Sequence, residues 1–244
     1  MKRYIKADDE FFDSWDDDTR LHLAEDPNTD PNILQELAKD YTSVIIREFV
    51  ARNPNTPIPA LKRLARDGDE EVRSAVAYNK NTTTDILKKL ATDYDIMVQD
   101  NVADHPNADA EVLDILAHHH PGWQACQYIA ENPKTSSETL DFLSTVTPSH
   151  HIFEFYKKLI CNPKTPHSAL ARLLNDKDSH WLLADYSTDP DVLDELSKIC
   201  PAYLKLNIAK NPNTPAETLN YLLKARSKEV KDAVRNHPNY IPMT

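Results

Sequence analysis

The chain has 244 residues and a formal net charge of −11, because 39 acidic residues outnumber 28 lysines and arginines. This surplus of acid disfavours a general binder of nucleic-acid backbones, which gains its affinity from lysine and arginine. The sequence contains only two glycines, whereas a Walker loop or a dinucleotide fingerprint needs several for the backbone to approach phosphate. ATPase, kinase and Rossmann-type functions are therefore excluded.

Two further features of the sequence indicate the cellular compartment of the protein. No apolar run approaches the length of about 18 residues that a transmembrane helix needs, and residues 1–12 lack the apolar segment of a secretory signal. Cys126, Cys161 and Cys200 are odd in number and scattered, which indicates reduced thiols rather than a disulfide framework. We expect a cytoplasmic protein without membrane contact.

Residues 1–25 are predicted to form an N-terminal cap and half a repeat. The acidic run Asp16, Asp17 and Asp18 indicates the start of a helix, because acidic side chains stabilise helix N-termini. Terminal repeats of an array are commonly atypical, since their outer face meets water.

Residues 52–77 show the repeating unit of the chain most clearly. Thr56 is predicted to cap a first helix that begins at Pro57 and ends at Gly68. A second helix follows, capped by Asp69. Each helix has one apolar face at helical spacing, and neither is long enough to be stable alone. Copies of the unit must therefore stack on one another.

The unit recurs along the whole chain at intervals of 26 or 27 residues, except for intervals of 30 and 23 around Asn162. Its starts are Asp26, Asn53, Asn79, His105, Asn132, Asn162, Asp185 and Asn211, with a stub at His237. Leucine stands eight and eleven residues after every one of the eight full starts. The threonine cap recurs at Thr29, Thr82, Thr135, Thr165, Thr188 and Thr214, with capping boxes from Thr135 to Glu138 and from Thr214 to Glu217. The pattern predicts helical repeats over residues 26–236 and a C-terminal stub over residues 237–244.

Two polar columns accompany the leucines. The residues at the starts are expected to satisfy turn amides. A basic column lies six residues before the starts, at Arg20, Arg47, Arg73, Lys205 and Lys231. It could form a track for an acidic ligand or a ladder of ion pairs with acids such as Asp69 and Glu71. The acidic composition favours the ladder.

The pattern ARNPNTP…LxxLA…VRxAVA, repeated over residues 19–239, resembles the leucine-rich repeat variant family, which is found mostly in bacterial proteins. The resemblance implies a right-handed superhelix of paired helices and no single activity. Some members carry a cysteine cluster for an iron–sulfur centre ahead of the repeats, but no cysteine precedes Asp26 here. We therefore predict an all-α right-handed α-solenoid of about eight 26-residue two-helix repeats, with second helices 3₁₀ in places and no cofactor.

The middle of the array is rich in aromatic side chains. The position nine residues before each start points away from the core face on a helical wheel. It holds Val44, Ile96, Trp123 and Phe153 in successive or near-successive units, against Asp17, Glu70, Asp176 and Lys228 towards the ends. Large apolar side chains at outward positions mark contact surfaces. The predicted partner-binding face consists of Trp123, Gln127, Phe153, Tyr156, His180 and Trp181. The unequal units around Asn162 leave open an inward orientation of Phe153 and Trp181.

Histidines also cluster in the middle, at His118, His119, His120, His150 and His151. Three consecutive side chains of a helix diverge too far to bind one ion, and a zinc site completed by the other histidines or by Cys126 is not expected. A Cys–His hydrolase would need a base and an orienting acid that the pattern does not supply. We predict neither a metal nor catalytic residues.

The predicted function is a non-enzymatic scaffold that binds another protein or a peptide on the concave, central surface of the solenoid. The alternative is a DNA-processing helical-repeat protein with Trp123 and Trp181 in its groove, which the net charge of −11 disfavours. A continuous positive groove would favour DNA, and a mixed apolar surface would favour a protein.

Overall fold

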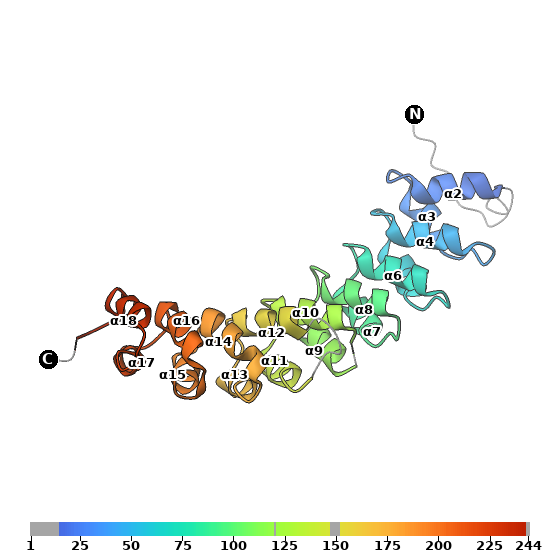
Figure 1. The fold of residues 1–244 in the computed structure, drawn as a ribbon. Coiled ribbons are helices and arrows are strands. Elements are labelled where there is room, and N and C mark those ends of the chain that lie inside the picture. Colours follow the sequence, from blue (N-terminus) through green and yellow to red (C-terminus); the bar gives the residue numbers. More distant parts are fainter. Residues whose placement is uncertain (1–14, 120, 147–151, 243–244) are drawn as a thin grey trace. The chain divides into compact units, whose positions relative to one another are not determined.

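The computed structural model describes residues 15–119, 121–146 and 152–242. These residues form helices joined by short turns, and no strand occurs among them. The chain divides into two compact units, Met1–Ala125 and Cys126–Thr244, which are described separately. In each unit consecutive helices pack in two layers, which is the arrangement of an α-solenoid (Figure 1). The predicted all-α fold class is confirmed.

In unit 1, first and second helices alternate along the chain. The first helices are α3 (Pro31–Leu37), α5 (Ile58–Leu64), α7 (Thr84–Leu90) and α9 (Ala110–His118). The second helices are α2 (Asp17–Glu25), α4 (Val44–Arg52), α6 (Glu70–Tyr78) and α8 (Ile96–Ala103), and α10 (Trp123–Glu131) contains the boundary between the units. Each second helix packs against the next, α2 on α4, α4 on α6 and α6 on α8.

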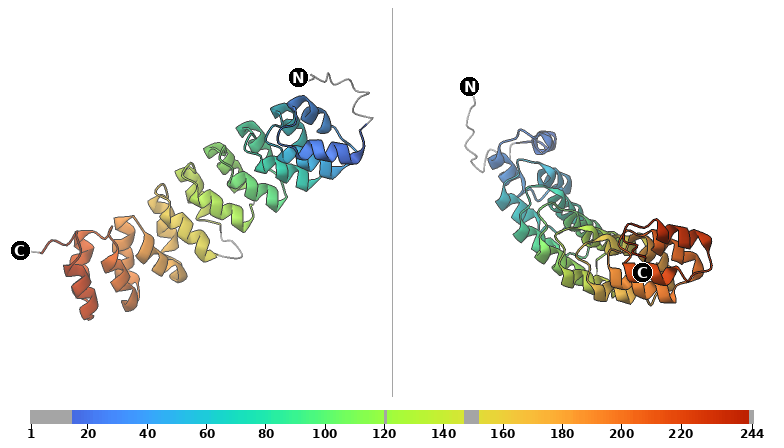
Figure 2. Two further views of the ribbon diagram at one scale, coloured as in Figure 1. Left: turned by 90° about the horizontal axis from the view of Figure 1, so that it is seen from above. Right: turned by 90° about the vertical axis from the view of Figure 1, so that its left-hand side faces the viewer.

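Unit 2 repeats this arrangement (Figure 2). Its first helices are α11 (Ser137–Leu143), α13 (His167–Leu173), α15 (Pro190–Ile199) and α17 (Ala216–Leu222). Its second helices are α12 (Ile152–Cys161), α14 (His180–Tyr186), α16 (Lys205–Lys210) and α18 (Lys228–Arg235). Short 3₁₀ segments, η1 (Lys177–Ser179) and η2 (Ala202–Leu204), lead into α14 and α16. The expectation of second helices that are 3₁₀ in places therefore holds at these two repeats.

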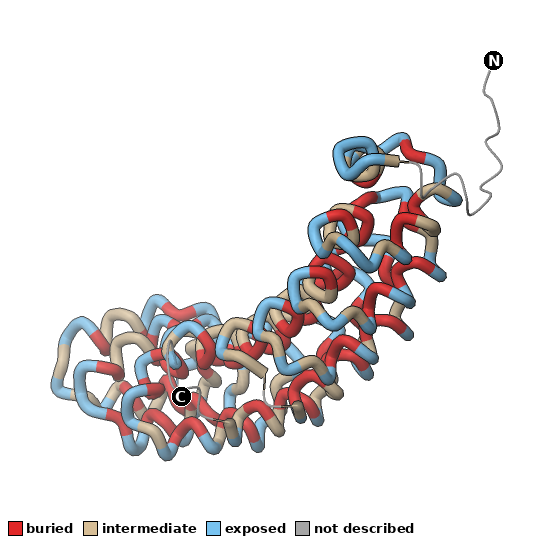
Figure 3. The backbone as a smooth tube through the Cα atoms, turned by 90° about the vertical axis from the view of Figure 1, so that its right-hand side faces the viewer, coloured by how far each residue is buried: buried red, intermediate tan, exposed pale blue. Residues whose placement is uncertain are grey.

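The leucine columns form the core between the layers. All sixteen predicted leucines are buried, with exposed fractions of 3% or less. The valine and isoleucine column of the second helices, such as Val50, Val76 and Ile129, is buried as well. Each of these helices accordingly contributes buried residues to the core along its unit (Figure 3). Because full burial of one leucine is worth about 1.5–3 kcal/mol, each short helix is stable through its neighbours rather than by itself.

The threonine column has a different role from the predicted one. Thr82 is buried, and its hydroxyl donates a hydrogen bond of 2.6 Å to the carbonyl of Val76, in the preceding helix. The same bond, to the carbonyl six residues earlier, is made by Thr56, Thr135, Thr165 and Thr214. The N-cap is the following residue in each repeat, as at Thr83 and Ser136. The predicted threonine caps and capping boxes are therefore wrong, because the residue after each threonine is the N-cap. At the five threonines named, the hydroxyl is bonded to the end of the previous helix instead.

The column at the repeat starts joins each repeat to the one before it. The Nδ2 of Asn79 donates to the carbonyls of Ala51 and Asn53, and its Oδ1 accepts from the amide of Asn81. His105 replaces asparagine with its ring, and its Nε2 lies 3.0 Å from the carbonyl oxygen of Asn79. The predicted structural role of this column is confirmed.

One repeat start differs from the predicted one. Ser187, which is buried, caps α14 and accepts with its carbonyl from Asn211 Nδ2, which also donates to the carbonyl of Ala184. Asp185 is exposed and accepts from Asn207. The turn before α15 is shorter than in the other repeats, so the start lies six and not eight residues before Leu193. Counting back eight residues from this leucine therefore places the start two residues too early.

Candidate functional site

The basic column of unit 1 is a ladder of ion pairs. Arg47 Nε and Nη2 lie 2.7 and 3.0 Å from the two carboxylate oxygens of Asp67. Arg73 holds Asp93 in the same way, at 2.6 and 3.1 Å. A third nitrogen of each arginine donates to the carbonyl of the turn aspartate in its own repeat, as Arg73 does to Asp67. The prediction of a ladder is confirmed for the arginines of unit 1, although the acids are those of the following turn and not Asp69 and Glu71. In unit 2, Lys205 lies instead over the ring of Tyr221.

These pairs shift the titration of the aspartates. Burial is the largest influence and raises the pKa of Asp67, but hydrogen bonds from Arg47 and from the amide of Asp69 outweigh it. The pKa of Asp67 therefore lies below its ordinary value, and the pKa of Asp93 is lowered by the same balance. The charges of Arg47 and Arg73 are thus already paired with carboxylates of the protein itself. They do not form a free track for an acidic ligand.

The ladder ends at Gln99, which positions the turn before Trp123. The side-chain amide of Gln99 donates to the carbonyl of Asp93, and its Oε1 accepts from the amide of Gly122 at 2.9 Å. A Cβ atom at Gly122 would lie 3.2 Å from Cγ2 of Ile96, so this close approach favours glycine. Trp123 then begins α10 with 38% of its surface exposed.

Two of the six predicted partner-binding residues meet in unit 2. The rings of Phe153 on α12 and Trp181 on α14 are stacked, with centroids 4.6 Å apart and planes inclined by 12°. Phe153 is half-buried and Trp181 is 37% exposed. Lys157, one turn after Phe153, places its Nζ 5.0 Å from the ring centroid of Tyr186 on α14. We call Phe153, Lys157, Trp181 and Tyr186 the α12–α14 aromatic face.

Tyr156 and His180 are buried, with exposed fractions of 8% and 5%. The ring of Tyr156 packs beside that of Phe155. His180 lies 2.7 Å, through Nε2, from the carbonyl oxygen of Leu174. Both were predicted to line an accessible surface, and their burial argues against that placement. Tyr156 stands six residues before Asn162, at the repeat position where Gln99 and Cys126 are buried as well. His180 stands seven residues before the observed start at Ser187, which is the position of the buried Val72 and Val98.

The remaining two predicted residues lie in different units. Trp123 belongs to unit 1, and Gln127, which is half-buried, belongs to unit 2. A single face through all six residues remains a prediction. Sequence reasoning missed Lys157 and Tyr186, although the four-residue spacing from Phe153 to Lys157 places both on one side of a helix.

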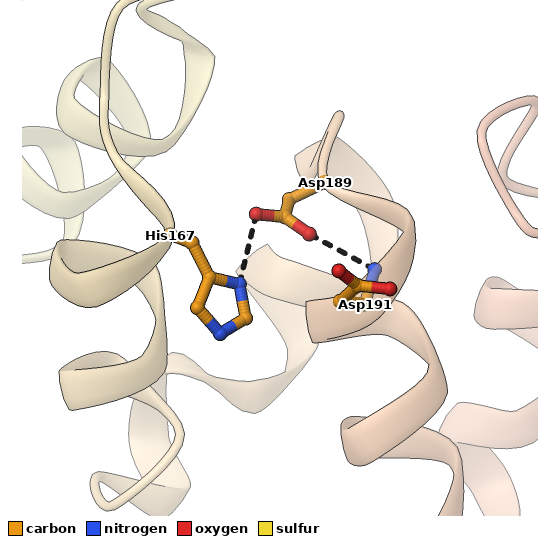
Figure 4. A group of neighbouring side chains, drawn as sticks. All are labelled: His167, Asp189 and Asp191. Atoms are coloured by element: carbon orange, nitrogen blue, oxygen red, sulfur yellow. Dashed lines mark hydrogen bonds and ion pairs between the residues drawn. The ribbon is translucent and has the colours of Figure 1, made fainter.

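One cluster in unit 2 has the composition of a metal site. The ligand atoms of His167, Asp189 and Asp191 lie within 4.8 Å of one another (Figure 4). Asp189 is the N-cap of α15, and its Oδ1 accepts from the amides of Asp191 and Val192. Its Oδ2 lies 3.0 Å from Nδ1 of His167. Helix capping and the hydrogen bond with His167 therefore account for both oxygens of Asp189 without an ion.

Two histidines of the cluster in the middle of the repeat array belong to the described residues, and both have neighbours close in sequence or in the adjacent repeat. His119 packs its ring against that of Tyr94, with centroids 5.3 Å apart. His118 Nδ1 lies 2.9 Å from the carbonyl oxygen of Asp114. The other members of the predicted cluster, His120, His150 and His151, lie outside the described residues. The expectation that no metal binds here is therefore still a prediction.

The cysteines give no sign of an activated nucleophile. Cys126 and Cys200 are buried and Cys161 is exposed. Burial is the largest influence on the thiols of Cys161 and Cys200 and raises the pKa of each. The reactive thiolate is consequently disfavoured at neutral pH.

Comparison with known proteins agrees with this repeat architecture. None of the helices in the described part of the chain is both long and apolar enough to cross a membrane. No curated protein matches the chain significantly. The family described as leucine rich repeat variant matches residues 46–69, which include most of α4, the turn at Asn53 and all of α5. The chain therefore carries the leucine rich repeat variant repeat that its sequence resembles.

Proposed function

We propose that this protein is a non-enzymatic scaffold that binds another protein or a peptide on the surface of its helical repeats. Helical-repeat proteins present extended surfaces built from neighbouring units, and the residues on those surfaces select the ligand. The observation that carries the proposal is the stacked pair of Phe153 and Trp181 on the α12–α14 aromatic face. The core of unit 2 is filled by its leucine columns, so the exposed indole is available to a partner.

Aromatic side chains suit this role because they supply a large contact area at little cost in conformational entropy. Stacking fixes the orientation of both rings before a partner arrives. Lys157, beside Tyr186, adds a cation to the rim of the same face. Trp123 and Gln127 remain proposed contacts, whereas Tyr156 and His180 are left out because they are buried.

The stack also links two neighbouring second helices, and such a pair is worth about 0.5–1.5 kcal/mol to the fold. A test must therefore separate binding from stability. We would compare partner capture from a lysate of the source organism by the wild type and by the double variant Phe153→Ala, Trp181→Ala. The matched control is the double variant Tyr78→Ala, Tyr203→Ala, which removes two other exposed aromatic rings.

The Phe153 and Trp181 variant is expected to lose capture of the partners that the wild type and the control retain. Its melting temperature should fall by only about 2–4 °C, as a loss near 1 kcal/mol implies for a chain of this size. Equal capture by the double variant and the control would refute this face as the binding site. A much larger fall in melting temperature would show that the rings hold the fold instead.

A further inference from the structure

We infer that unit 1 contains a second docking site, an open groove that binds an extended acidic peptide segment of a partner protein. The groove follows the turns between first and second helices, at the C-terminal ends of α3, α5 and α7. It consists of two adjoining hollows of about 710 and 630 Å³. Arg66 lines both hollows, and we call them together the turn groove. It shares no residue with the α12–α14 aromatic face.

The turn groove is cationic although the protein is acidic. A third, smaller hollow adjoins these two between α5 and α7. Together the three hollows are lined by seven lysines or arginines and four aspartates. The aspartates Asp67 and Asp93 are already paired with Arg47 and Arg73 of the ladder. Their charge is therefore neutralised within the protein, and the other cations determine the sign of the groove.

Three of these cations are available to a ligand. Lys62, Arg66 and Lys89 are exposed, and within the described part of the chain no carboxylate lies within ion-pair distance of them. Lys62 and Lys89 lie in the last turns of α5 and α7, where a cation also stabilises the helix dipole. Arg66 lies beyond the end of α5, so the dipole does not account for it. A guanidinium in this position can bind a carboxylate through two parallel hydrogen bonds.

Tyrosines stand at the two ends of the groove. Tyr41 lines one hollow and Tyr94 the other, and they are 92% and 89% exposed. Both directly follow the turn aspartate of their repeats, and Gly68 occupies the same position in the repeat between them. Phenol rings at both ends would cover the apolar parts of a bound peptide.

Gly68 keeps the middle of the groove open. A Cβ atom added there would have no neighbour within 4 Å, and the backbone of Gly68 is not in the left-handed region that favours glycine. Neither crowding nor backbone conformation therefore calls for glycine at this position. The absence of a side chain at Gly68 leaves open space beside Arg66, in the repeat between those of the two tyrosines.

The charges favour a peptide over a nucleic acid. Asp40, Asp67, Asp85 and Asp93 line the hollows among the cations. A phosphodiester backbone carries a charge at every step and would meet these carboxylates. In an extended peptide successive side chains point to opposite sides, so even a run of glutamates presents a carboxylate to the groove only at every second residue. These spaced carboxylates can meet Lys62, Arg66 and Lys89 in turn.

The test measures binding of fluorescein-labelled decaglutamate to the full chain by fluorescence anisotropy. The triple variant Lys62→Glu, Arg66→Glu, Lys89→Glu should bind at least about tenfold more weakly, because it replaces three attractive charges by repulsive ones. The control triple variant Lys80→Glu, Lys164→Glu, Lys177→Glu has the same net charge, alters exposed lysines outside the hollows, and should bind within about twofold of the wild type.

A second pair of variants tests the shape of the groove. Gly68→Trp should weaken decaglutamate binding severalfold, while Gly68→Ala should leave it unchanged. Both should unfold at the wild-type urea concentration, since a side chain at Gly68 enters open space. This measurement keeps the inference testable even if the charge variants fold poorly.

Several outcomes would overturn the inference. Equal weakening by the two triple variants would show that only the net charge matters. Tighter binding of a ten-nucleotide oligothymidine that depends on Lys62, Arg66 and Lys89 would assign the groove to nucleic acid. Removal of residues 1–14, which include Asp8, Asp9 and Glu10, is expected to leave the affinity unchanged. A marked rise would make this segment the occupant instead of a partner.

Discussion

At the scale of single residues, the polar side chain at each repeat start is a cross-link between neighbouring repeats. Asn79 is buried, and its three hydrogen bonds connect its own turn to the carbonyls of Ala51 and Asn53 around the preceding repeat start. Asn79→Leu is expected to cost about 2–4 kcal/mol in free energy of unfolding, since it leaves these backbone groups buried without partners. Urea denaturation measures this loss. Asn81→Leu, which changes an exposed side chain in the same turn, is the control and should cost under about 1 kcal/mol.

His105 shows that a ring can take the place of asparagine in this column. Its Nδ1 accepts from the amide of Asn107, so its Nε2 is the donor to the carbonyl of Asn79. His105→Asn should therefore retain both bonds and change the free energy of unfolding by less than about 1 kcal/mol. His105→Leu should cost as much as Asn79→Leu. Equal losses for the two His105 variants would contradict the assigned tautomer and role.

The ladder of unit 1 predicts a pH dependence. Because the pKa of Asp67 is lowered in the folded protein, its ion pair stabilises the fold above the unfolded pKa of about 3.9. That contribution is lost as the pH falls from there through the lower folded pKa. Asp67→Asn should therefore reduce the free energy of unfolding at pH 7 by about 1–3 kcal/mol, and the difference from the wild type should shrink below about pH 4.

Urea denaturation between about pH 3 and pH 7 measures this difference. Asp69→Asn is the control, since Asp69 caps α6 and does not pair with Arg47. A gap between the wild type and Asp67→Asn that stayed constant down to pH 3 would show that the pair with Arg47 is not what Asp67 contributes.

At the scale of helices and turns, the threonine column holds the end of one helix rather than the start of the next. Thr82→Val keeps the shape of the side chain but removes its bond to the carbonyl of Val76, and should cost about 1–2 kcal/mol. Thr83 is the N-cap of α7 but makes no capping bond with its side chain. Thr83→Val is therefore expected to change the free energy of unfolding by less than about 0.5 kcal/mol. If Thr83→Val proved the more damaging of the two, a threonine would cap α7 after all, one residue later than predicted.

The helices could be predicted from the sequence because the spacing of their apolar residues follows from which side of each helix is buried. Two leucines at fixed positions in each repeat predict which side of each first helix is buried, and all of them are. The turns were harder to predict, since their roles depend on hydrogen bonds between repeats. Thr56 fits an N-cap equally well in sequence, and only the structure shows its hydroxyl bonded to Val50.

The candidate surfaces were predictable only in part. Phe153 and Trp181 were both placed on one predicted face, and the structure stacks their rings between adjacent repeats, whereas the face as a whole remains a prediction. The burial of His180 was missed because the sequence placed the repeat start at Asp185, whereas the observed start at Ser187 puts His180 at a core position of its helix. The turn groove escaped the sequence pattern for another reason. Its available cations lie in the last turns of first helices and, for Arg66, in the turn that follows, and its shape depends on the absence of a side chain at Gly68.

At the scale of the whole molecule, the packing predicts that damage in one repeat stays near that repeat. In unit 1, α7 contacts α6, α8 and α9, and each repeat of such an array is stabilised mainly by its nearest neighbours. Leu87 is fully buried in α7. Leu87→Ala is therefore expected to cost about 2–5 kcal/mol locally. Amide hydrogen exchange should accelerate in α6 to α9 and keep its wild-type rates in α15 to α18.

Hydrogen exchange followed by mass spectrometry distinguishes this local response from global unfolding. Leu193→Ala, which removes a fully buried leucine from α15 in unit 2, is the matched variant and should give the reversed pattern. Its faster exchange should appear in α14 to α17, which pack around α15, and be absent from α3 to α7. If either variant accelerated exchange equally in both units, the protein would unfold as one cooperative block, and stability would not be a sum over neighbouring repeats.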